Sequence, residues 1–181
     1  MNIFILEGEN NKIDWKKSAE SLDNLRIVKM ILESTQMIST IYQQYDKKEG
    51  LYKPTHLNHP CTQWVGQSFE NFSLAIQHTH YMNEEFNRRF GKTHKSIEII
   101  KSIQEQEFKH FFHSFSFTLP PLAMNEEFKS EDIIESYRDY FVSKDLMKYN
   151  LYDIPSWFYE KRNKPFFVRR NNDSKYILME V

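Results

Sequence analysis

The sequence has a single cysteine, Cys61, among its 181 residues. An intramolecular disulfide needs two cysteines and a multi-thiolate zinc site needs several, so both are excluded. The chain also has only four glycines, and none lies in a G-x-G-x-x-G or G-x-x-x-x-G-K pattern. The glycine-rich phosphate-binding loops of Rossmann and P-loop enzymes are therefore absent. There is likewise no G-x-S-x-G or H-E-x-x-H motif, so the most recognisable hydrolase signatures are missing.

Long hydrophobic runs and an excess of one charge are lacking as well. No stretch approaches the roughly 20 apolar residues of a transmembrane helix, and the run Ile3 to Leu6 is too short for the core of a signal peptide. With the lone cysteine, this predicts a soluble, cytoplasmic protein that makes no membrane contact. The 24 basic and 25 acidic side chains give a formal net charge of −1, which argues against a polybasic protein and leaves local basic patches open.

The residues that are present favour a helical protein. Apolar residues make up 40% of the chain and aromatic residues 15%, which is enough to bury a core. The length favours one domain over residues 1–181, with a helical core over about 14–148 and a C-terminal basic and aromatic region over 155–181. The predicted fold class is mainly α: a compact helical domain with a short N-terminal strand and a C-terminal β-hairpin.

Hydrophobic spacing and breaker residues give the expected bounds of these elements. Asp23 can cap a second helix after a break, Asn58 or His59 can cap a helix that starts at Pro60, and Gly91 can end another. We expect a strand at 2–6, helices at about 14–45 (with a break at 21–23), from Pro60 onward, at 68–90, at 95–113 and at 131–148, and a hairpin whose strands at 166–168 and 176–179 flank 171–174.

A polar stripe runs along the helix expected at about 22–42. Arg26, Lys29, Glu33 and Gln36 follow one another at spacings of three, four and three residues, so they lie on one helix face. Most of the remaining residues in this stretch are apolar, which is typical of a largely buried helix whose polar stripe looks into a cleft. The alternative is a solvated face with an ordinary Lys29–Glu33 pair.

Functional side chains are dense in the segment from Tyr52 to Trp64, which reads YKPTHLNHPCTQW. Histidine titrates near neutral pH, and a helix N-terminus offers free amides to an anion, so the segment suits acid–base chemistry or substrate docking. His56 and His59 could also ligate a metal ion with a third ligand such as His94 or Glu33. The structural alternative is that these histidines cap helices and bind backbone carbonyls.

Two clusters of basic residues stand out although the charge of the whole chain is balanced. One surrounds the turn at Gly91, and the other is interleaved with aromatic residues near the C-terminus, as on a surface that binds phosphates and bases. A solvated basic edge on a hairpin is the alternative. The aromatic run from Phe108 to Phe117 is interpreted as packing rather than as a base-stacking platform. The cations predicted to bind nucleic acid are Arg88, Lys92, Lys161, Arg162, Lys164, Arg169 and Arg170.

Three blocks of sequence resemble a family of small proteins encoded by T-even-type and other tailed phages, a family without an established activity. The blocks are LDNLRIVKMILESTQMIST, YKPTHLNHPCTQW and RFGKTHKS, and the resemblance spans roughly residues 2–100. Family members often carry His or Arg at the position of Arg26, followed by a core that Lys29, Met30, Leu32 and Glu33 match here. The resemblance implies phage biology in the host cytoplasm, and it favours one site that combines the stripe with the His56/His59 loop.

The His59-Pro60 junction and the all-α build are also similar to the pyrimidine-dimer DNA glycosylases. These small α proteins excise damaged bases through an amine nucleophile with a glutamate partner. In that family the amine is exposed by removal of the initiator methionine; here Asn2 follows Met1 and is too bulky to favour removal. The resemblance therefore points to Lys29, in a desolvated setting beside Glu33, as the amine that attacks a sugar C1′.

We accordingly predict a phage enzyme that acts on a base or its glycosidic bond in DNA or a nucleotide, with no cofactor and no metal. Lys29, Glu33, His56 and His59 are the predicted catalytic residues. Two alternatives stay open: a non-catalytic phage protein that binds a host protein or a nucleotide signal, and a metal-dependent hydrolase that uses His56, His59 and His94. The side chains predicted to bind substrate are Arg26, Gln36, Lys53, Thr55, Asn58, Asn71, Arg89 and His94.

Overall fold

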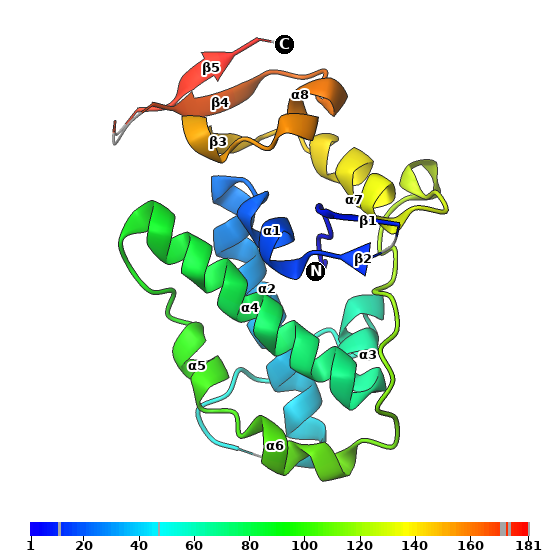
Figure 1. The fold of residues 1–181 in the computed structure, drawn as a ribbon. Coiled ribbons are helices and arrows are strands. Elements are labelled where there is room, and N and C mark those ends of the chain that lie inside the picture. Colours follow the sequence, from blue (N-terminus) through cyan, green and yellow to red (C-terminus); the bar gives the residue numbers. More distant parts are fainter. Residues whose placement is uncertain (11, 47, 171–172, 174, 181) are drawn as a thin grey trace. The chain divides into compact units, whose positions relative to one another are not determined.

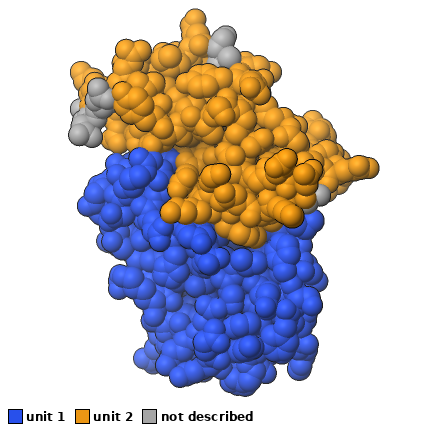
Figure 2. All heavy atoms as spheres, in the orientation of Figure 1, with its two compact units in different colours: residues 1–3, 28–123 blue, residues 4–27, 124–181 orange. Residues whose placement is uncertain are grey.

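The computed structural model describes residues 1–10, 12–46, 48–170, 173 and 175–180. Over these residues the chain is mainly α-helical with small sheets, which confirms the predicted fold class. It divides into two compact units, coloured separately in Figure 2: unit 1 comprises residues 1–3 and 28–123, and unit 2 comprises 4–27 and 124–181. The single domain over residues 1–181 stays a prediction. In the described part of the chain, no helix combines the length and apolar character that a membrane span requires.

Unit 1 is built from helices (Figure 1). Its two long helices are α2 (Asn24–Tyr45), which belongs to unit 1 from Val28 onward, and α4 (Phe69–Phe90). An aromatic cluster fills part of its core: the Tyr42 and Phe108 rings stack with centroids 4.3 Å apart, and Phe72 lies 5.1 Å from Phe108. The shorter elements are α3 (Pro60–Gln67), α5 (Ile97–Lys101), α6 (Glu105–Phe108) and η1 (Lys109–Phe111).

The helix ends of unit 1 follow the sequence closely. The His59 side chain accepts a hydrogen bond from the backbone N–H of Cys61, so His59 caps α3, and Pro60 occupies its first turn. Ser68 caps α4 by accepting from the N–H of Asn71. Gly91 ends α4 with φ of 66°, a left-handed conformation that glycine adopts without steric cost.

Unit 2 combines short helices with two small sheets. Strands β1 (Gly8–Glu9) and β2 (Lys12–Ile13) pair antiparallel, while β3 (Lys148–Asn150) runs parallel to β4 (Phe166–Arg169), which pairs antiparallel with β5 (Ile177–Met179). The strands β4 and β5 confirm the expected hairpin; the connecting positions 171, 172 and 174 lie outside the described residues. The helical elements are α1 (Trp15–Glu20), η2 (Glu126–Phe128), α7 (Ile133–Val142), η3 (Leu151–Asp153) and α8 (Ser156–Lys161).

Three expected elements were wrong. Residues 2–6, all of them described, form no strand: their apolar side chains are buried, and the N–H groups of Ile3 and Leu6 donate to side chains of Asn2 and Ser18 rather than to a neighbouring strand. The helix expected at 95–113 is broken into α5, α6 and η1. The helix expected at 131–148 ends at Val142, because residues 148–150 pair with β4 instead.

Candidate functional site

The N-terminal residues of unit 1 are held against α2 and α3. The α-amino nitrogen of Met1 lies 3.6 Å from Oε2 of Glu33 on α2, and the hydroxyl of Thr62 on α3 donates to the Met1 sulfur at 3.8 Å. Asn2 donates through Nδ2 to the carbonyl of Ala123 at 3.2 Å. The Met1 side chain is 3% exposed and that of Glu33 is 13% exposed. The Met1 side chain and most of the Glu33 side chain are therefore buried, and Glu33 still reaches the surface.

Lys29 is the second cation beside Glu33, at the position predicted from the i,i+4 spacing. Its Nζ lies 3.4 Å from Oε1 of Glu33, but its side chain is 67% exposed. The prediction of a desolvated lysine nucleophile requires burial, which lowers the tendency of an amine to hold its proton. Lys29 is instead a solvated partner of Glu33.

His59 links α3 to this ion pair. Its Nδ1 accepts from the N–H of Cys61 at 3.2 Å, so the neutral ring carries its proton on Nε2. Burial lowers the pKa of His59, the positive charges of the Met1 ammonium and His56 lower it further, and Glu33 opposes them. The two groups predicted from separate sequence segments, Glu33 and His59, thus act on each other electrostatically within unit 1, with His59 held in its neutral form.

Cys61 lies in the first turn of α3, two residues after His59, and is fully buried. Burial raises the pKa of its thiol to about 12; the Met1 ammonium and a hydrogen bond from the backbone of Ile3 act in the opposite direction, and Glu33 adds to the rise. The thiolate is the reactive form of cysteine. Cys61 is therefore a packing residue of this site and not a nucleophile.

The loop that precedes α3 is fixed by backbone contacts. Thr40 of α2 donates to the carbonyl of Thr55 and accepts from its N–H, at 3.1 and 3.0 Å. The Thr55 hydroxyl lies 2.7 Å from Nδ1 of His56, whose backbone has φ of 50°, in the left-handed region. His56, Lys53 and Asn58 are exposed, and Gln36 on α2 is half-buried. These side chains are available to a ligand at the surface.

Two residues predicted to bind substrate are occupied by structural contacts. Asn71 is fully buried: its Nδ2 donates to the carbonyl of Trp64 and to Thr118 Oγ1, and its carbonyl accepts from the N–H of Thr118. Arg26, in unit 2, pairs with buried Asp23 at 3.1 Å and donates to the carbonyl of Leu146. Burial raises the pKa of Asp23, although Arg26 and backbone donors act against it. Substrate binding by Asn71 and Arg26 stays a prediction, weakened by these contacts.

The cluster near Gly91 is also largely paired. Arg89 is a buried side chain whose Nε donates to Oε1 of Glu85 at 2.5 Å, and Arg88 binds the same carboxylate from a more exposed position. The role of Arg89 in substrate binding stays a prediction, weakened by its burial and this ion pair. His94 is half-buried, its Nδ1 accepts from the N–H of Ser96, and burial lowers its pKa. Lys92 is exposed.

The C-terminal basic cluster is mostly neutralised within unit 2. Arg162 is 2% exposed, and its guanidinium donates to five backbone carbonyls, those of Val142, Lys144, Asp145, Lys164 and Pro165. A guanidinium has five N–H donors, so none is left for a phosphate. The phosphate contact of Arg162 stays a prediction, and its burial, which a charge pattern does not reveal, argues against it.

The other cations of this cluster differ in how they are held. Lys161 pairs with Glu135 and Asp139, and Lys164 with Asp145. Arg169 donates to Oδ1 of Asn150 at 3.0 Å and lies over the Tyr176 ring. Arg170 is exposed. Their binding to nucleic acid stays a prediction, weakened by these pairings for all but Arg170.

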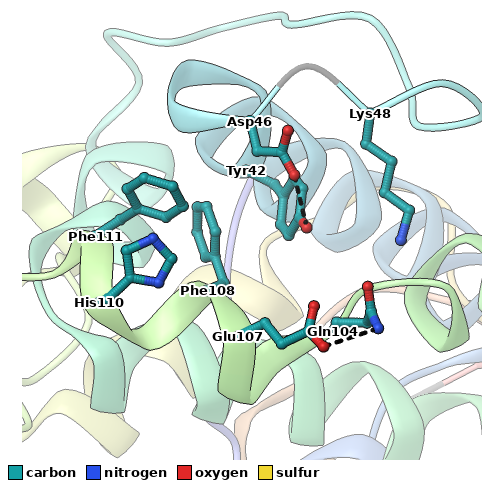
Figure 3. Close-up of a pocket in the computed structure, with 8 residues that line it drawn as sticks. All are labelled: Tyr42, Asp46, Lys48, Gln104, Glu107, Phe108, His110 and Phe111. Atoms are coloured by element: carbon teal, nitrogen blue, oxygen red, sulfur yellow. Dashed lines mark hydrogen bonds between the residues drawn. The ribbon is translucent and has the colours of Figure 1, made fainter.

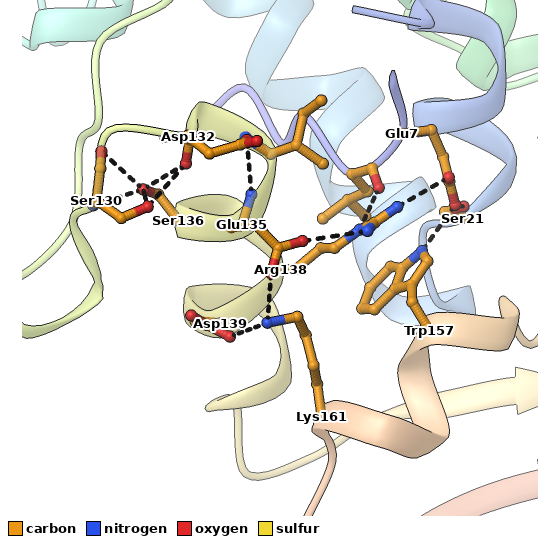
Figure 4. A network of polar contacts seen from close by, with 12 residues as sticks. Glu7, Ser21, Ser130, Asp132, Glu135, Ser136, Arg138, Asp139, Trp157 and Lys161 are labelled. Atoms are coloured by element: carbon orange, nitrogen blue, oxygen red, sulfur yellow. Dashed lines mark hydrogen bonds and ion pairs between the residues drawn. The ribbon is translucent and has the colours of Figure 1, made fainter. Parts of the chain in front are cut away.

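Figure 4 shows a polar network in unit 2 that the sequence did not suggest. The Glu7 carboxylate accepts from Ser21 Oγ at 2.5 Å, from Trp157 Nε1 at 2.7 Å and from an Arg138 nitrogen at 3.1 Å. Arg138 also donates to the carbonyl of Leu6 and pairs with Glu135. Glu7 and Arg138 each have a partner of opposite charge and further hydrogen bonds. The network therefore holds the N-terminal segment of unit 2 to α7 and α8.

No three-ligand metal site is formed. In the part of the chain that the structure describes, no group of three or more His, Cys, Asp or Glu side chains could hold a metal ion. His56, His59 and His94 therefore do not make the ligand set that a metal-dependent hydrolase would need. Surface pockets of about 410, 500 and 540 Å³ open elsewhere, around Tyr42, Glu9 and Ser73, and none of the three is lined by Met1, Glu33 or His59.

Comparisons with known proteins add nothing to this geometry: no protein-family model matches the chain, and neither a curated protein nor a solved structure is detectably similar to it. The residue that sequence reasoning missed is Met1. The sequence marks only Glu33 as a candidate, because the approach of Met1 to Glu33 depends on contacts between residues far apart in the chain.

Proposed function

We propose that this protein is an enzyme that acts on a base or its glycosidic bond in DNA or a nucleotide, and that Glu33 is the group that moves the proton in this reaction. The observation that carries the proposal is the setting of the Glu33 carboxylate, whose side chain is 13% exposed and whose Oε1 lies 3.4 Å from Lys29 Nζ. A carboxylate that is mostly buried and still reaches the surface can take a proton from a water molecule beside a bound substrate.

The chemistry follows from the position of this carboxylate. Glu33 takes a proton from a water molecule, whose oxygen forms a bond to the sugar C1′ while the bond from C1′ to the base breaks. The departing base keeps the electron pair of the broken bond and takes the proton from Glu33, which restores the carboxylate. The sugar then carries a hydroxyl group at C1′.

Lys29 is the solvated cation beside this carboxylate, with a side chain that is 67% exposed. Its proposed role is to balance the charge of Glu33.

The test is cleavage of the glycosidic bond, read as alkali-labile strand breaks, in single- and double-stranded oligonucleotides that carry a damaged base or a pyrimidine dimer. Glu33→Gln should lower the rate by about 10²- to 10⁴-fold, the usual contribution of a general acid or base. Lys29→Arg, the matched control on the same carboxylate, should remain close to the parent.

The proposal fails if the parent protein releases no base from any of these oligonucleotides, or if Glu33→Gln retains the full rate. Thermal unfolding of each variant shows that a loss of rate is not a loss of fold. Glu33 is still 13% exposed and Lys29 is mostly exposed, so neither substitution opens a cavity in the core.

A second candidate, a non-catalytic protein that binds a host protein, is favoured by one surface feature. Phe115, Phe117 and Leu119 occupy alternate positions of a segment without regular structure and are 49%, 43% and 46% exposed. Contiguous exposed apolar side chains are typical of interaction surfaces. This function would be preferred if no base is released and if Phe117→Ser abolishes capture of one defined host protein that the parent retains.

A further inference from the structure

A pocket of about 410 Å³ in unit 1 carries a second set of unused groups (Figure 3). It lies where the C-terminal end of α2 meets α6 and η1, and it is lined by residues of these elements and of the chain just after α2. Its lining contains neither Met1 nor Glu33. What it binds is therefore independent of the function proposed above.

One part of the pocket is rich in hydrogen-bond acceptors. The Tyr42 hydroxyl donates to Oδ2 of Asp46 at 3.3 Å, and Nε2 of Gln104 donates to Oε1 of Glu107 at 3.2 Å. Burial and the Asp46 carboxylate raise the pKa of Tyr42, so the phenol stays a donor. Each carboxylate then has a second oxygen for which the described residues supply no hydrogen-bond donor. Asp46 and Glu107 are both exposed, so these oxygens face a pocket that a ligand can enter.

The other part of the pocket is aromatic. Phe108 stacks on Tyr42 with ring centroids 4.3 Å apart, Phe111 lies 5.1 Å from Phe108, and the His110 ring lies 3.9 Å from Phe111. In Figure 3 these rings stand on one side, while Lys48 stands on the other. Aromatic faces carry negative electrostatic potential and attract cations.

The charge balance argues against an anionic ligand. Lys48 is the lysine that lines the pocket, and its ammonium already donates to the carbonyl of Ser102. Among the described residues that line the pocket, two carboxylates stand against one ammonium that is already bonded, so this described part is negative when histidine is neutral. A phosphate or a carboxylate would be repelled, whereas a cation would meet both acceptors and an aromatic wall.

We propose that this pocket binds an organic cation, an alkylammonium or guanidinium group whose N–H donors reach Asp46 and Glu107 while its carbon skeleton lies on Phe111. Charge-assisted hydrogen bonds to carboxylates supply the orientation, and the rings supply apolar contact. The same chemistry is offered by a free diamine and by an arginine side chain of a peptide.

The test is isothermal titration of the whole protein with agmatine and, separately, with acetyl-Gly-Arg-Gly-amide at low salt. One-to-one binding of either probe is expected, and the tighter of the two identifies the source of the cation. Asp46→Asn and Glu107→Gln should each weaken binding about tenfold, because each removes one charged acceptor. Higher salt should weaken binding as well.

Glu98→Gln is the matched control, since Glu98 is a 68% exposed carboxylate that pairs with Lys101 and does not line the pocket. It removes the same charge and should leave binding unchanged. The proposal is overturned if neither probe binds at millimolar concentration, if Glu98→Gln weakens binding as much as Glu107→Gln does, or if butanesulfonate binds as well as agmatine.

Discussion

Replacement of Arg162 by methionine should destabilise unit 2 strongly, because the guanidinium joins separate stretches of that unit. Its five N–H groups donate to carbonyls between residues 142 and 165, and the side chain is 2% exposed. The contact with Val142 is buried at both ends, while the other four carbonyls regain water when the donor is removed. Taking about 3 kcal/mol for the first contact and about 0.5 kcal/mol for each of the other four gives a loss of about 5 kcal/mol.

The assay is urea unfolding followed by tryptophan fluorescence and far-ultraviolet circular dichroism. Arg162→Lys keeps at most three of the five donors, so it should lose about half as much stability as Arg162→Met. Arg170→Met, the matched control at an exposed arginine of the same unit, should change stability by less than about 0.5 kcal/mol. A loss below about 1 kcal/mol for Arg162→Met would refute the assignment of this arginine to folding rather than to phosphate binding.

Three further outcomes are expected. The Cys61 thiol, with its pKa raised to about 12, should react with iodoacetamide at pH 8 about a thousandfold more slowly in the native protein than in urea; equal rates would show that the thiol is not buried. Because folding lowers the pKa of His59, its contribution to stability is complete above the unfolded-state pKa of about 6.5 and is lost as pH falls through the folded-state pKa. His59→Asn, which keeps a helix cap, should therefore flatten the fall in melting temperature between about pH 6.5 and 5, and an unchanged slope would contradict this. Gly91→Ala should cost about 1 kcal/mol of unfolding free energy, since φ is 66° and a Cβ would meet no atom within 4 Å, whereas Gly91→Asn should cost less; an equal melting temperature for all three proteins would contradict the strain argument.

Local chemistry made several helix ends predictable. Pro60 with its cap at His59, and Gly91 at the end of α4, act through their own backbone and nearest neighbours, so the sequence is enough to place them. The wrong predictions concern segments whose structure depends on residues elsewhere in the fold. Residues 148–150 fit a helical pattern but pair with residues 167–169, and residues 2–6 fit a strand pattern but find buried side-chain partners instead.

The candidate site was predictable in part for the same reason. Glu33 and His59 were recognised from residue type and helical position, and they influence each other in the structure. The Met1 amine was missed because its position depends on long-range packing. Arg162 and Lys161 were predicted to contact phosphates. Spacing along the chain does not show that backbone carbonyls already bind Arg162 and that carboxylates already pair with Lys161.

The most direct test of the proposed function compares the parent protein with Glu33→Gln on an oligonucleotide that carries a damaged base. Glycosidic cleavage is read as alkali-labile strand breaks, and a parallel sample contains borohydride to trap any covalent adduct. The parent should cleave the bond, Glu33→Gln should lose this activity, and no adduct should form. No cleavage by the parent, full cleavage by Glu33→Gln, or a trapped adduct on Lys29 would contradict the proposal.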